Sequence, residues 1–264
     1  MPTAKIAGTD LAYDVRGDGP ALLLLHAFPL RLAMWDDQAR ALSSSFRVVR
    51  FDCRGFGATP PGDGLLTMER IADDAAALLD HLDVGAATVG GLSMGGYAAF
   101  AFVRRHPSRL RALVLADTKP AADSDAARRT RAEQAETVRR EGSAALADAV
   151  LGKLVGRTTH ESRPGVLARV KDMILAGTPR GITDALAGLA ARGDSTPTLR
   201  EIRVPTLVVC GEEDVITPPA EAEAMHHAIG GSTLELVPGA GHLANLEAPE
   251  HFNRALSSFL RRVG

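Results

Sequence analysis

The chain has 264 residues, of which 45% are hydrophobic and 23% charged, and its formal net charge at pH 7 is −2. This composition is close to that of ordinary globular proteins. The nearly balanced charge argues against nucleic acid or an acidic membrane surface as a partner, because such partners select strongly basic surfaces. The length allows one large domain with an insertion, and nothing in it indicates an oligomeric state.

Residues 1–17 lack the basic and apolar regions of a signal peptide. The longest strongly apolar run, Ala21–Leu25, is far shorter than the roughly 20 residues that cross a bilayer. Cys53 and Cys210 each lie at or near the end of an expected strand, which favours buried, reduced thiols over a disulfide. We therefore expect a cytoplasmic protein with no membrane partner.

Short runs rich in β-forming residues recur along the chain, and several are apolar without alternation, which predicts strands buried on both faces. The runs are Leu11–Val15, Ala21–Leu25, Arg47–Phe51, Ala87–Val89, Leu110–Leu115, Thr206–Cys210 and Thr233–Val237. Helical patterns lie between several of them, as at 67–82 behind a Thr67 cap. The alternation predicts an α/β fold with a mostly parallel, doubly wound sheet.

The alternation stops after the fifth run, and residues 119–203 contain only helix-like segments separated by Gly, Pro and Thr. We expect this stretch to be an inserted helical lid, or cap, on a core formed by residues 1–118 and 204–264. A helix closing the core is expected at 249–262. Oppositely charged residues at spacing i,i+4 near the start of the lid indicate a solvated helix face rather than a site for an anionic substrate. They are Arg129 with Glu133 and Glu136 with Arg140.

Residues 88–96, Thr-Val-Gly-Gly-Leu-Ser-Met-Gly-Gly, lead from an expected strand into an expected helix at 94–106 and contain the G-x-S-x-G pattern of a nucleophile elbow. The sharp turn at Ser93 brings neighbouring chain so close that only glycine fits at positions 91 and 95. The start of the helix presents N–H groups to negative charge. We therefore interpret Ser93 as a nucleophile rather than as part of an ordinary Gly-Ser turn.

A serine hydroxyl needs a base to take its proton and a third group to orient that base. Of the eight histidines, His242 alone follows a late expected strand within a Gly-rich loop. Asp214 follows the expected strand before it. The order Ser, Asp, His is the one expected where strand ends place the three side chains above the carboxyl edge of the sheet. The sequence thus predicts Ser93 as nucleophile, His242 as base and Asp214 as acid.

Three other acidic residues also lie near strand ends. Asp117 is the main alternative to Asp214, because it ends the strand before the lid. Glu212 and Glu213 come early in their turn, and we expect at least one of them to cap the turn or face solvent.

The loop after Ala21–Leu25 lies where an oxyanion-hole loop is expected. The backbone N–H of Phe28, together with that of Met94, is predicted to bind the developing oxyanion. An ordinary strand-exit turn ending at Pro29 is the alternative. Trp35, the one tryptophan, is a candidate wall of the substrate site facing the lid, although a half-buried packing role fits its position equally well.

Five segments together make the chain resemble the α/β-hydrolase superfamily over nearly its whole length. They are His26–Pro29, Asp52–Gly57, Gly91–Gly96, Gly211–Asp214 and Gly239–His242. The Gly-Leu-Ser-Met-Gly-Gly turn and the short lid are most similar to 3-oxoadipate enol-lactonases and the related bacterial carboxylesterases and cofactor-free haloperoxidases.

The resemblance implies metal-free acyl transfer at Ser93, with a small ester or lactone as substrate and no cofactor. The chain departs from the family pattern at Ala27, where glycine is usual, and at Thr59, where serine is usual. In the segment Asp52–Gly57 we expect Asp52 and Arg54 to tie loops together beneath the catalytic histidine.

Other functions fit the same sequence. Carbon–carbon bond hydrolysis of a ring-cleavage product uses the same three residues, and peroxide in place of water would give haloperoxidase-like activity. A ligand receptor on the same fold is the non-enzymatic alternative. Dehalogenase and many epoxide-hydrolase activities are argued against, because they need a carboxylate at position 93.

Overall fold

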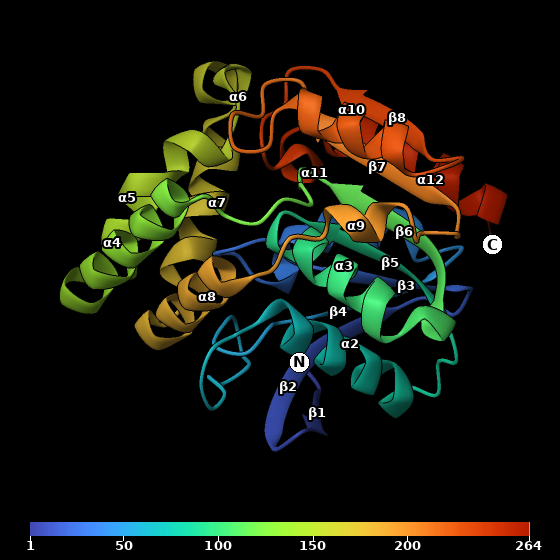
Figure 1. Ribbon diagram of the computed structural model, residues 1–264, viewed down its shortest axis with the longest axis horizontal. Coiled ribbons are helices and arrows are strands. Elements are labelled where there is room, and N and C mark those ends of the chain that lie inside the picture. The colour runs from blue at the N-terminus through green and yellow to red at the C-terminus, as the bar shows by residue number, and fades with distance from the viewer. Residues whose placement is uncertain (264) are drawn as a thin grey trace.

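The computed structural model of this protein describes residues 1–263. These residues form one β-sheet, in which most neighbouring strands are parallel. The sheet has eight strands in the order β1-β2-β4-β3-β5-β6-β7-β8 (Figure 1). Only the pairs β1–β2 and β2–β4 are antiparallel. The strands are β1 (Thr3–Ile6), β2 (Thr9–Arg16), β3 (Ala21–Leu25), β4 (Arg47–Phe51), β5 (Ala87–Leu92), β6 (Leu110–Ala116), β7 (Thr206–Gly211) and β8 (Thr233–Val237).

Helices cover both faces of the sheet, as the doubly wound pattern predicts. On one face α2 packs on α3, and α3 packs on β3, β5 and β6. On the other face α1 packs against α12. These core helices are α1 (Asp36–Leu42), α2 (Met68–His81), α3 (Met94–Arg105), α10 (Pro219–Ala228), α11 (Ala244–Glu247) and α12 (Pro249–Val263), with short 3₁₀ turns η1 (Leu32–Trp35) and η2 (Pro107–Arg109).

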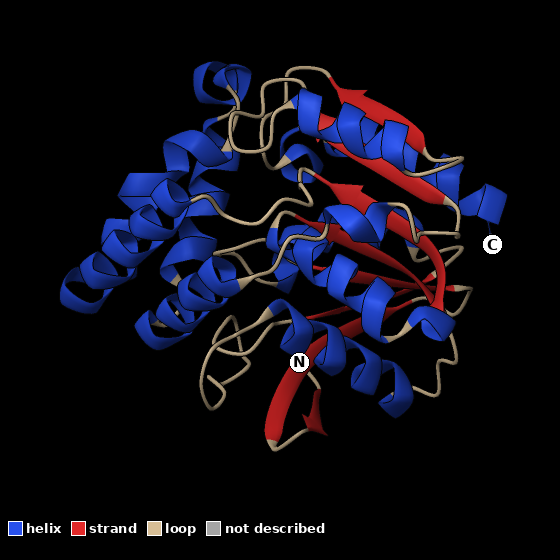
Figure 2. Cartoon of the chain, viewed as in Figure 1, coloured by secondary structure: helices blue, strands red, loops and turns tan. Residues whose placement is uncertain are grey.

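Six helices and no strand occupy the described chain between β6 and β7. They are α4 (Asp125–Glu141), α5 (Ser143–Leu154), α6 (Arg157–Ser162), α7 (Pro164–Leu175), α8 (Pro179–Ala191) and α9 (Thr196–Leu199). The arrowheads of β6 and β8 point toward α4–α8, so these helices lie at the carboxyl ends of the strands (Figures 1 and 2). The short α9 instead packs against α3 of the core.

The sequence pattern accounts for most of these elements. Every residue of β5 and β7 is buried, as expected for central parallel strands. The side chain of Thr67 accepts a hydrogen bond from the backbone N–H of Arg70 and caps α2 where predicted. Cys53 and Cys210 are both buried free thiols. Among the described residues, no helix combines the length and the apolar character needed to cross a bilayer.

Two details differ from the sequence-based expectation. The strand β1 was not predicted, because its four residues alternate between exposed and buried positions and give no continuous apolar run. On α4 the predicted i,i+4 pairs do not form; instead Arg139 pairs with Glu136 at spacing i,i+3. The helix face that carries them is nevertheless exposed, as predicted.

Polar and close backbone contacts fix the helices between β6 and β7 to the core. The carboxylate of Glu213 accepts hydrogen bonds from the backbone N–H (2.8 Å) and the hydroxyl (2.6 Å) of Thr158. A second contact joins α8 to the loop after β4. The two backbones lie so close together that a Cβ atom on Gly181 would overlap the backbone of Gly55. Glu213 therefore neither faces solvent freely nor orients His242, but joins the core to α6.

We predict that Gly181→Ala lowers the free energy of unfolding by about 1–3 kcal/mol, because the added methyl group has to push the two backbones apart. Gly165→Ala is the matched control, since Gly165 also lies in a helix of this region and its added Cβ would meet open space. Urea unfolding followed by circular dichroism measures both. Equal unfolding free energies for the two variants would contradict the proposed close contact.

Candidate active site

Ser93 lies at the turn between β5 and α3 with strained backbone torsions, φ 54° and ψ −112°. Positive φ is unfavourable for a residue with a Cβ and persists only where the surroundings enforce it. Here the N–H of Ser93 donates to the carbonyl of Ala116 (3.0 Å), and its own carbonyl accepts from the hydroxyl of Thr118 (3.0 Å). The end of β6 therefore holds the turn in place.

The glycines on both sides of Ser93 have the steric role that the sequence predicts. A Cβ atom on Gly91 would overlap the backbone of Gly95, and a Cβ atom on Gly95 would overlap the carbonyl of Leu25 at the end of β3. The turn can close only without these side chains.

Three side chains from three strand ends form one hydrogen-bonded chain. The Nε2 atom of His242 lies 2.8 Å from the Oγ atom of Ser93, and its Nδ1 atom lies 2.8 Å from Oδ2 of Asp214. All three residues are buried. A carboxylate can only accept a hydrogen bond, so Nδ1–H donates to Asp214 and Nε2 is left to accept the proton of the Ser93 hydroxyl.

The carboxylate of Asp214 is satisfied on both oxygens. Oδ1 accepts from the backbone N–H groups of Ile216 (2.8 Å) and Thr217 (3.0 Å), and Oδ2 also accepts from the Thr217 hydroxyl (2.7 Å). Burial opposes ionisation of Asp214, but the charge interaction with His242 and the hydrogen bonds from His242 and Thr217 outweigh it and hold its pKa below the usual value. Asp214 is thus an ionised partner for His242.

Asp117, the alternative acid, lies in the same buried region but makes no hydrogen bond to His242. Its Oδ1 accepts from the N–H of Gly211 (2.8 Å), whereas its Oδ2 is buried without a partner among the described residues. Burial, and then the negative charge of Asp214, raise the pKa of Asp117 well above its usual value. Of the acidic candidates, the geometry brings only Asp214 to the imidazole, and Glu212 is exposed.

Asp117, Asp214 and Cys210 place potential metal-binding atoms within 4.8 Å of one another. Burial raises the pKa of the Cys210 thiol, so the sulfur stays protonated. Both oxygens of Asp214 already have protein donors. The donor set is therefore a poor match for a cation, which needs deprotonated and available ligands.

A cavity of about 330 Å³ opens beside Ser93 and His242. Its volume is at the lower end of the range for small-molecule sites. The other lining residues are Phe28, Pro29, Met94, Tyr97, Ala127, Thr130, Arg131, Gln134, Val150, Lys153, Leu154, Leu189 and Ile216. The two residues predicted for the oxyanion hole, Phe28 and Met94, thus lie at this cavity.

Trp35 does not line the cavity, so its interpretation as a wall of the substrate site is corrected. The indole is 1% exposed and packs against Phe252 of α12, with ring centroids 6.0 Å apart. Trp35 belongs to η1, which packs against β3, β4, α1 and α11. Trp35 therefore has a packing role, which was the alternative that the sequence allowed.

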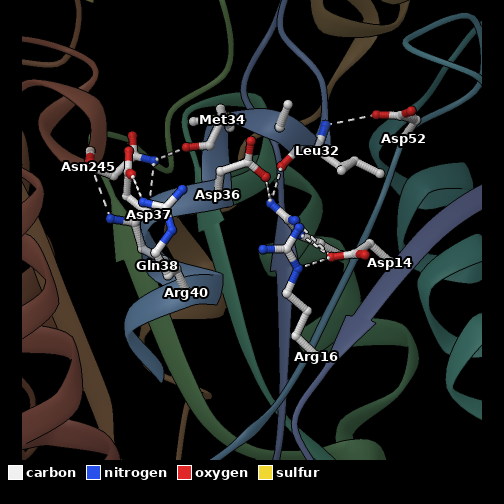
Figure 3. Close-up of polar contacts among 12 residues, drawn as sticks. Asp14, Arg16, Leu32, Met34, Asp36, Asp37, Gln38, Arg40, Asp52 and Asn245 are labelled. Atoms are coloured by element: carbon white, nitrogen blue, oxygen red, sulfur yellow. Dashed lines mark hydrogen bonds and ion pairs between the residues drawn. The ribbon is translucent and has the colours of Figure 1, made fainter. Parts of the chain in front are cut away.

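The chain that follows Phe28 is fixed by polar contacts (Figure 3). The backbone N–H of Leu32 donates to Asp52 (2.8 Å), and the side-chain amide of Asn245 donates to the carbonyl of Met34 (2.9 Å). The N–H of Ala27 points to the sulfur of Met34 (3.1 Å). These contacts link the predicted oxyanion loop to α11, the segment that follows His242.

Both departures from the family pattern fit their positions. Ala27 is fully buried and is not among the residues with positive φ, so its backbone does not need glycine. The hydroxyl of Thr59 accepts a hydrogen bond from the N–H of Ala12 (2.9 Å), a contact that serine or threonine can make.

Asp52 and Arg54 are structural, although Arg54 does not lie beneath His242. Arg54 forms a buried ion pair with Asp74 of α2, with two contacts of 2.7 Å, and donates to the carbonyl of Ile6 (3.2 Å). It therefore joins the loop after β4 to α2 and to β1, a strand that the sequence did not predict.

Glu247 is a residue that the sequence analysis missed. Its Oε1 accepts from the N–H groups of Gly241 (2.9 Å) and Leu243 (3.1 Å), the two neighbours of His242. Its Oε2 accepts from the N–H of Gly156, just before α6 (2.8 Å). The one available signal was an acidic residue among the small and apolar residues of 243–248.

Comparison with known proteins assigns the family. The model of the alpha/beta hydrolase fold matches residues 20–249, and the chain belongs to this family. An esterase from Thermogutta terrifontis is 42% identical, with a TM-score of 0.95 over 100% of this chain and 97% of that one. The enol-lactonase from Burkholderia xenovorans is 32% identical, with a TM-score of 0.92 over 98% and 100%.

Among curated relatives, 3-oxoadipate enol-lactonase 2 of Acinetobacter baylyi is 29% identical over 99% of each chain. The fold class and the resemblance to enol-lactonases and esterases that the sequence predicts are therefore confirmed.

We predict that Asp117→Asn stabilises the protein at neutral pH by about 1 kcal/mol or more. The pKa of Asp117 is higher in the folded than in the unfolded chain, so the folded state binds more protons and stability falls as pH rises between the two values. Asparagine imitates the protonated acid and tolerates positive φ, as Asp117 requires (φ 43°). Urea unfolding measured at pH 5 and at pH 8 should show that the free energy of unfolding falls less for the variant than for the native protein as the pH rises. An equal fall in both proteins would contradict the raised pKa of Asp117.

Proposed function

We propose that this protein is a serine hydrolase that cleaves a carboxylic ester or a lactone through an acyl-enzyme intermediate on Ser93. The observation that carries the proposal is the buried chain from the Ser93 hydroxyl through His242 to ionised Asp214, with both joining distances at 2.8 Å. The likeness to an esterase and to enol-lactonases supports the ester or lactone as substrate class.

In the proposed acylation step, the Oγ atom of Ser93 attacks the substrate carbonyl while Nε2 of His242 takes its proton. Asp214 holds the imidazole in the tautomer that can accept this proton and stabilises the imidazolium that forms. The imidazolium then protonates the leaving alcohol, or the ring oxygen of a lactone. The ester bond breaks and the acyl group stays on Ser93.

The tetrahedral intermediate carries a negative charge on the former carbonyl oxygen. We assign its stabilisation to the backbone N–H groups of Met94, at the start of α3, and Phe28, both at the cavity. One such donor contributes roughly 3–4 kcal/mol to the transition state. The strained turn at Ser93 holds its hydroxyl 2.8 Å from Nε2 of His242, and Met94 is the next residue, the first of α3.

In the proposed deacylation step, His242 takes a proton from water, the water oxygen attacks the acyl carbonyl, and Ser93 leaves with the proton returned by the imidazolium. This sequence needs no cofactor. The helices of residues 119–203 would act as a lid that contributes one wall of the cavity through α4, α5 and α8.

We predict that a fluorophosphonate probe labels the native protein and that Ser93→Ala abolishes both labelling and hydrolysis of p-nitrophenyl acetate. The reason is that no other hydroxyl lies at hydrogen-bond distance from Nε2 of His242 among the described residues. Ser45→Ala, at an exposed turn, is the control and should behave as native protein. Full hydrolysis by the Ser93 variant would refute the proposal, and slow hydrolysis by native protein would favour a carbon–carbon bond hydrolase.

Asp214→Asn should lower kcat by about 10³- to 10⁴-fold, because an amide can donate to Nδ1 and so favours the wrong imidazole tautomer. Asp117→Asn should retain most of the activity, since Asp117 makes no contact with His242. Steady-state kinetics on both variants tests the assignment of the acid. A large loss in the Asp117 variant with little loss in the Asp214 variant would transfer the role to Asp117.

A further inference from the structure

The carboxylate of Glu247 is buried and is bound by backbone N–H groups rather than by a cation. The residue is 3% exposed. Among the described residues, the hydrogen bonds to its two oxygens come from the N–H groups of Gly241, Leu243 and Gly156. All three partners can only donate, so both oxygens accept, as those of an ionised carboxylate do. A buried glutamate without a cationic partner is a rare and costly part of a protein core.

The three donors come from two parts of the chain that are far apart in the sequence. Two of them flank His242 in the base loop, which we define as residues 239–243, and both bind Oε1 (2.9 and 3.1 Å). The third belongs to Gly156, the residue before α6, and binds Oε2 (2.8 Å). The side chain of Glu247 thus joins the backbone on both sides of the base to the start of α6.

The end of α6 binds the base loop as well. Arg163, which follows α6, donates from Nη1 to the carbonyl of Gly239 (3.1 Å) and to that of Glu247 (2.8 Å). The two backbones also meet directly, because a Cβ atom on Gly241 would lie 2.3 Å from the backbone nitrogen of Gly156, which is an overlap. The short helix α6 is therefore docked on the base loop at both of its ends.

The loop that carries the acid belongs to the same network. Glu213, the residue before Asp214, accepts from the N–H and the hydroxyl of Thr158 in α6. Its own N–H donates to the carbonyl of Ala240 in the base loop (2.8 Å). Within this network the imidazole has to keep two distances of 2.8 Å at once, to Oγ of Ser93 and to Oδ2 of Asp214. A misplacement of about 1 Å can cost a reaction about 100-fold in rate, so the position of the base loop matters for catalysis.

We propose that Glu247 is a positioning residue: by joining the base loop to α6, it holds His242 where both hydrogen bonds of the imidazole can form. This inference rests on the proposed function and adds a requirement to it, namely that α6 stays docked on the base loop during catalysis. The imidazole makes no hydrogen bond to Glu247. Glu247 therefore acts through the backbone and takes no part in proton transfer.

The first variant is Glu247→Gln, which keeps the size of the side chain but replaces one acceptor oxygen by an amide nitrogen that can only donate. That nitrogen faces either the N–H of Gly156 or the two N–H groups beside His242, so one side of the contact is lost. We expect kcat for p-nitrophenyl acetate to fall by about 10- to 100-fold and KM to change by less than about twofold, because Glu247 does not line the cavity. The NMR signal of the Nδ1 proton of His242, which Asp214 accepts, should shift or broaden.

Gly156→Ala tests the same contact from the side of α6, with Glu247 and every catalytic group unaltered. Its added Cβ would overlap the base loop, so kcat should fall while KM stays nearly constant. The double variant should lose no more than about twofold beyond the larger single loss, because both changes act on one contact. Two controls should keep native kcat: Gly152→Ala, whose added Cβ meets open space on α5, and Glu235→Gln, since Glu235 bonds to His251 of α12.

Circular dichroism and urea unfolding establish that each variant is folded under the assay conditions. Native kcat with an unaltered Nδ1 signal in folded Glu247→Gln would overturn the proposal, and so would a loss confined to KM or losses that multiply in the double variant. If Glu247→Gln does not fold, Gly156→Ala decides the proposal with the same two readouts. If native protein does not hydrolyse the ester, the proposed function fails, and the Nδ1 signal alone decides whether Glu247 positions His242.

Discussion

The positive φ of Ser93 is the constraint on which the rest of the site depends. An extended or helical backbone at this position would carry the hydroxyl away from His242. The torsion persists because glycines on both sides allow the chain to close on itself and because Ala116 and Thr118 bind the backbone of Ser93. The sheet thus supplies the stabilisation that a strained residue needs, and it does so where the neighbouring strands β5 and β6 end.

The same sheet fixes the partners of Ser93. His242 follows β8 and Asp214 follows β7, and the parallel direction of these strands brings their carboxyl ends to one edge. Glu247 then holds the backbone on both sides of His242 and also binds the chain before α6. Because the carboxylate of Glu247 joins the loop of His242 to the chain before α6, the position of α6 and the position of His242 are coupled.

Much of this arrangement was predictable from sequence because it rests on local rules. The glycines around Ser93 and in the loop of His242 indicate tight turns of the backbone. The near-continuous apolar runs indicate strands that are buried on both faces. The choice between Asp214 and Asp117 had a weaker basis, since both follow neighbouring parallel strands and only the spatial path of the side chains separates them.

Other features depend on contacts between residues far apart in the sequence, and local sequence patterns do not predict such contacts. Trp35 is a candidate site residue by sequence because it follows the predicted oxyanion loop, yet it packs against Phe252, near the opposite end of the chain. The rotation of α4 about its own axis likewise decides whether an arginine of this helix lines the cavity or faces solvent. A pattern of alternating charges indicates an exposed face but does not show which neighbouring residue, here Arg131, turns inward.

The central claim is that bond cleavage passes through a covalent acyl group on Ser93, and intact-protein mass spectrometry combined with peptide mapping tests it most directly. The protein is mixed with excess p-nitrophenyl ester and quenched in acid during turnover. The account predicts a mass increase of one acyl group, located on the peptide that contains Ser93. Turnover without any adduct, or an adduct on another residue, would contradict it.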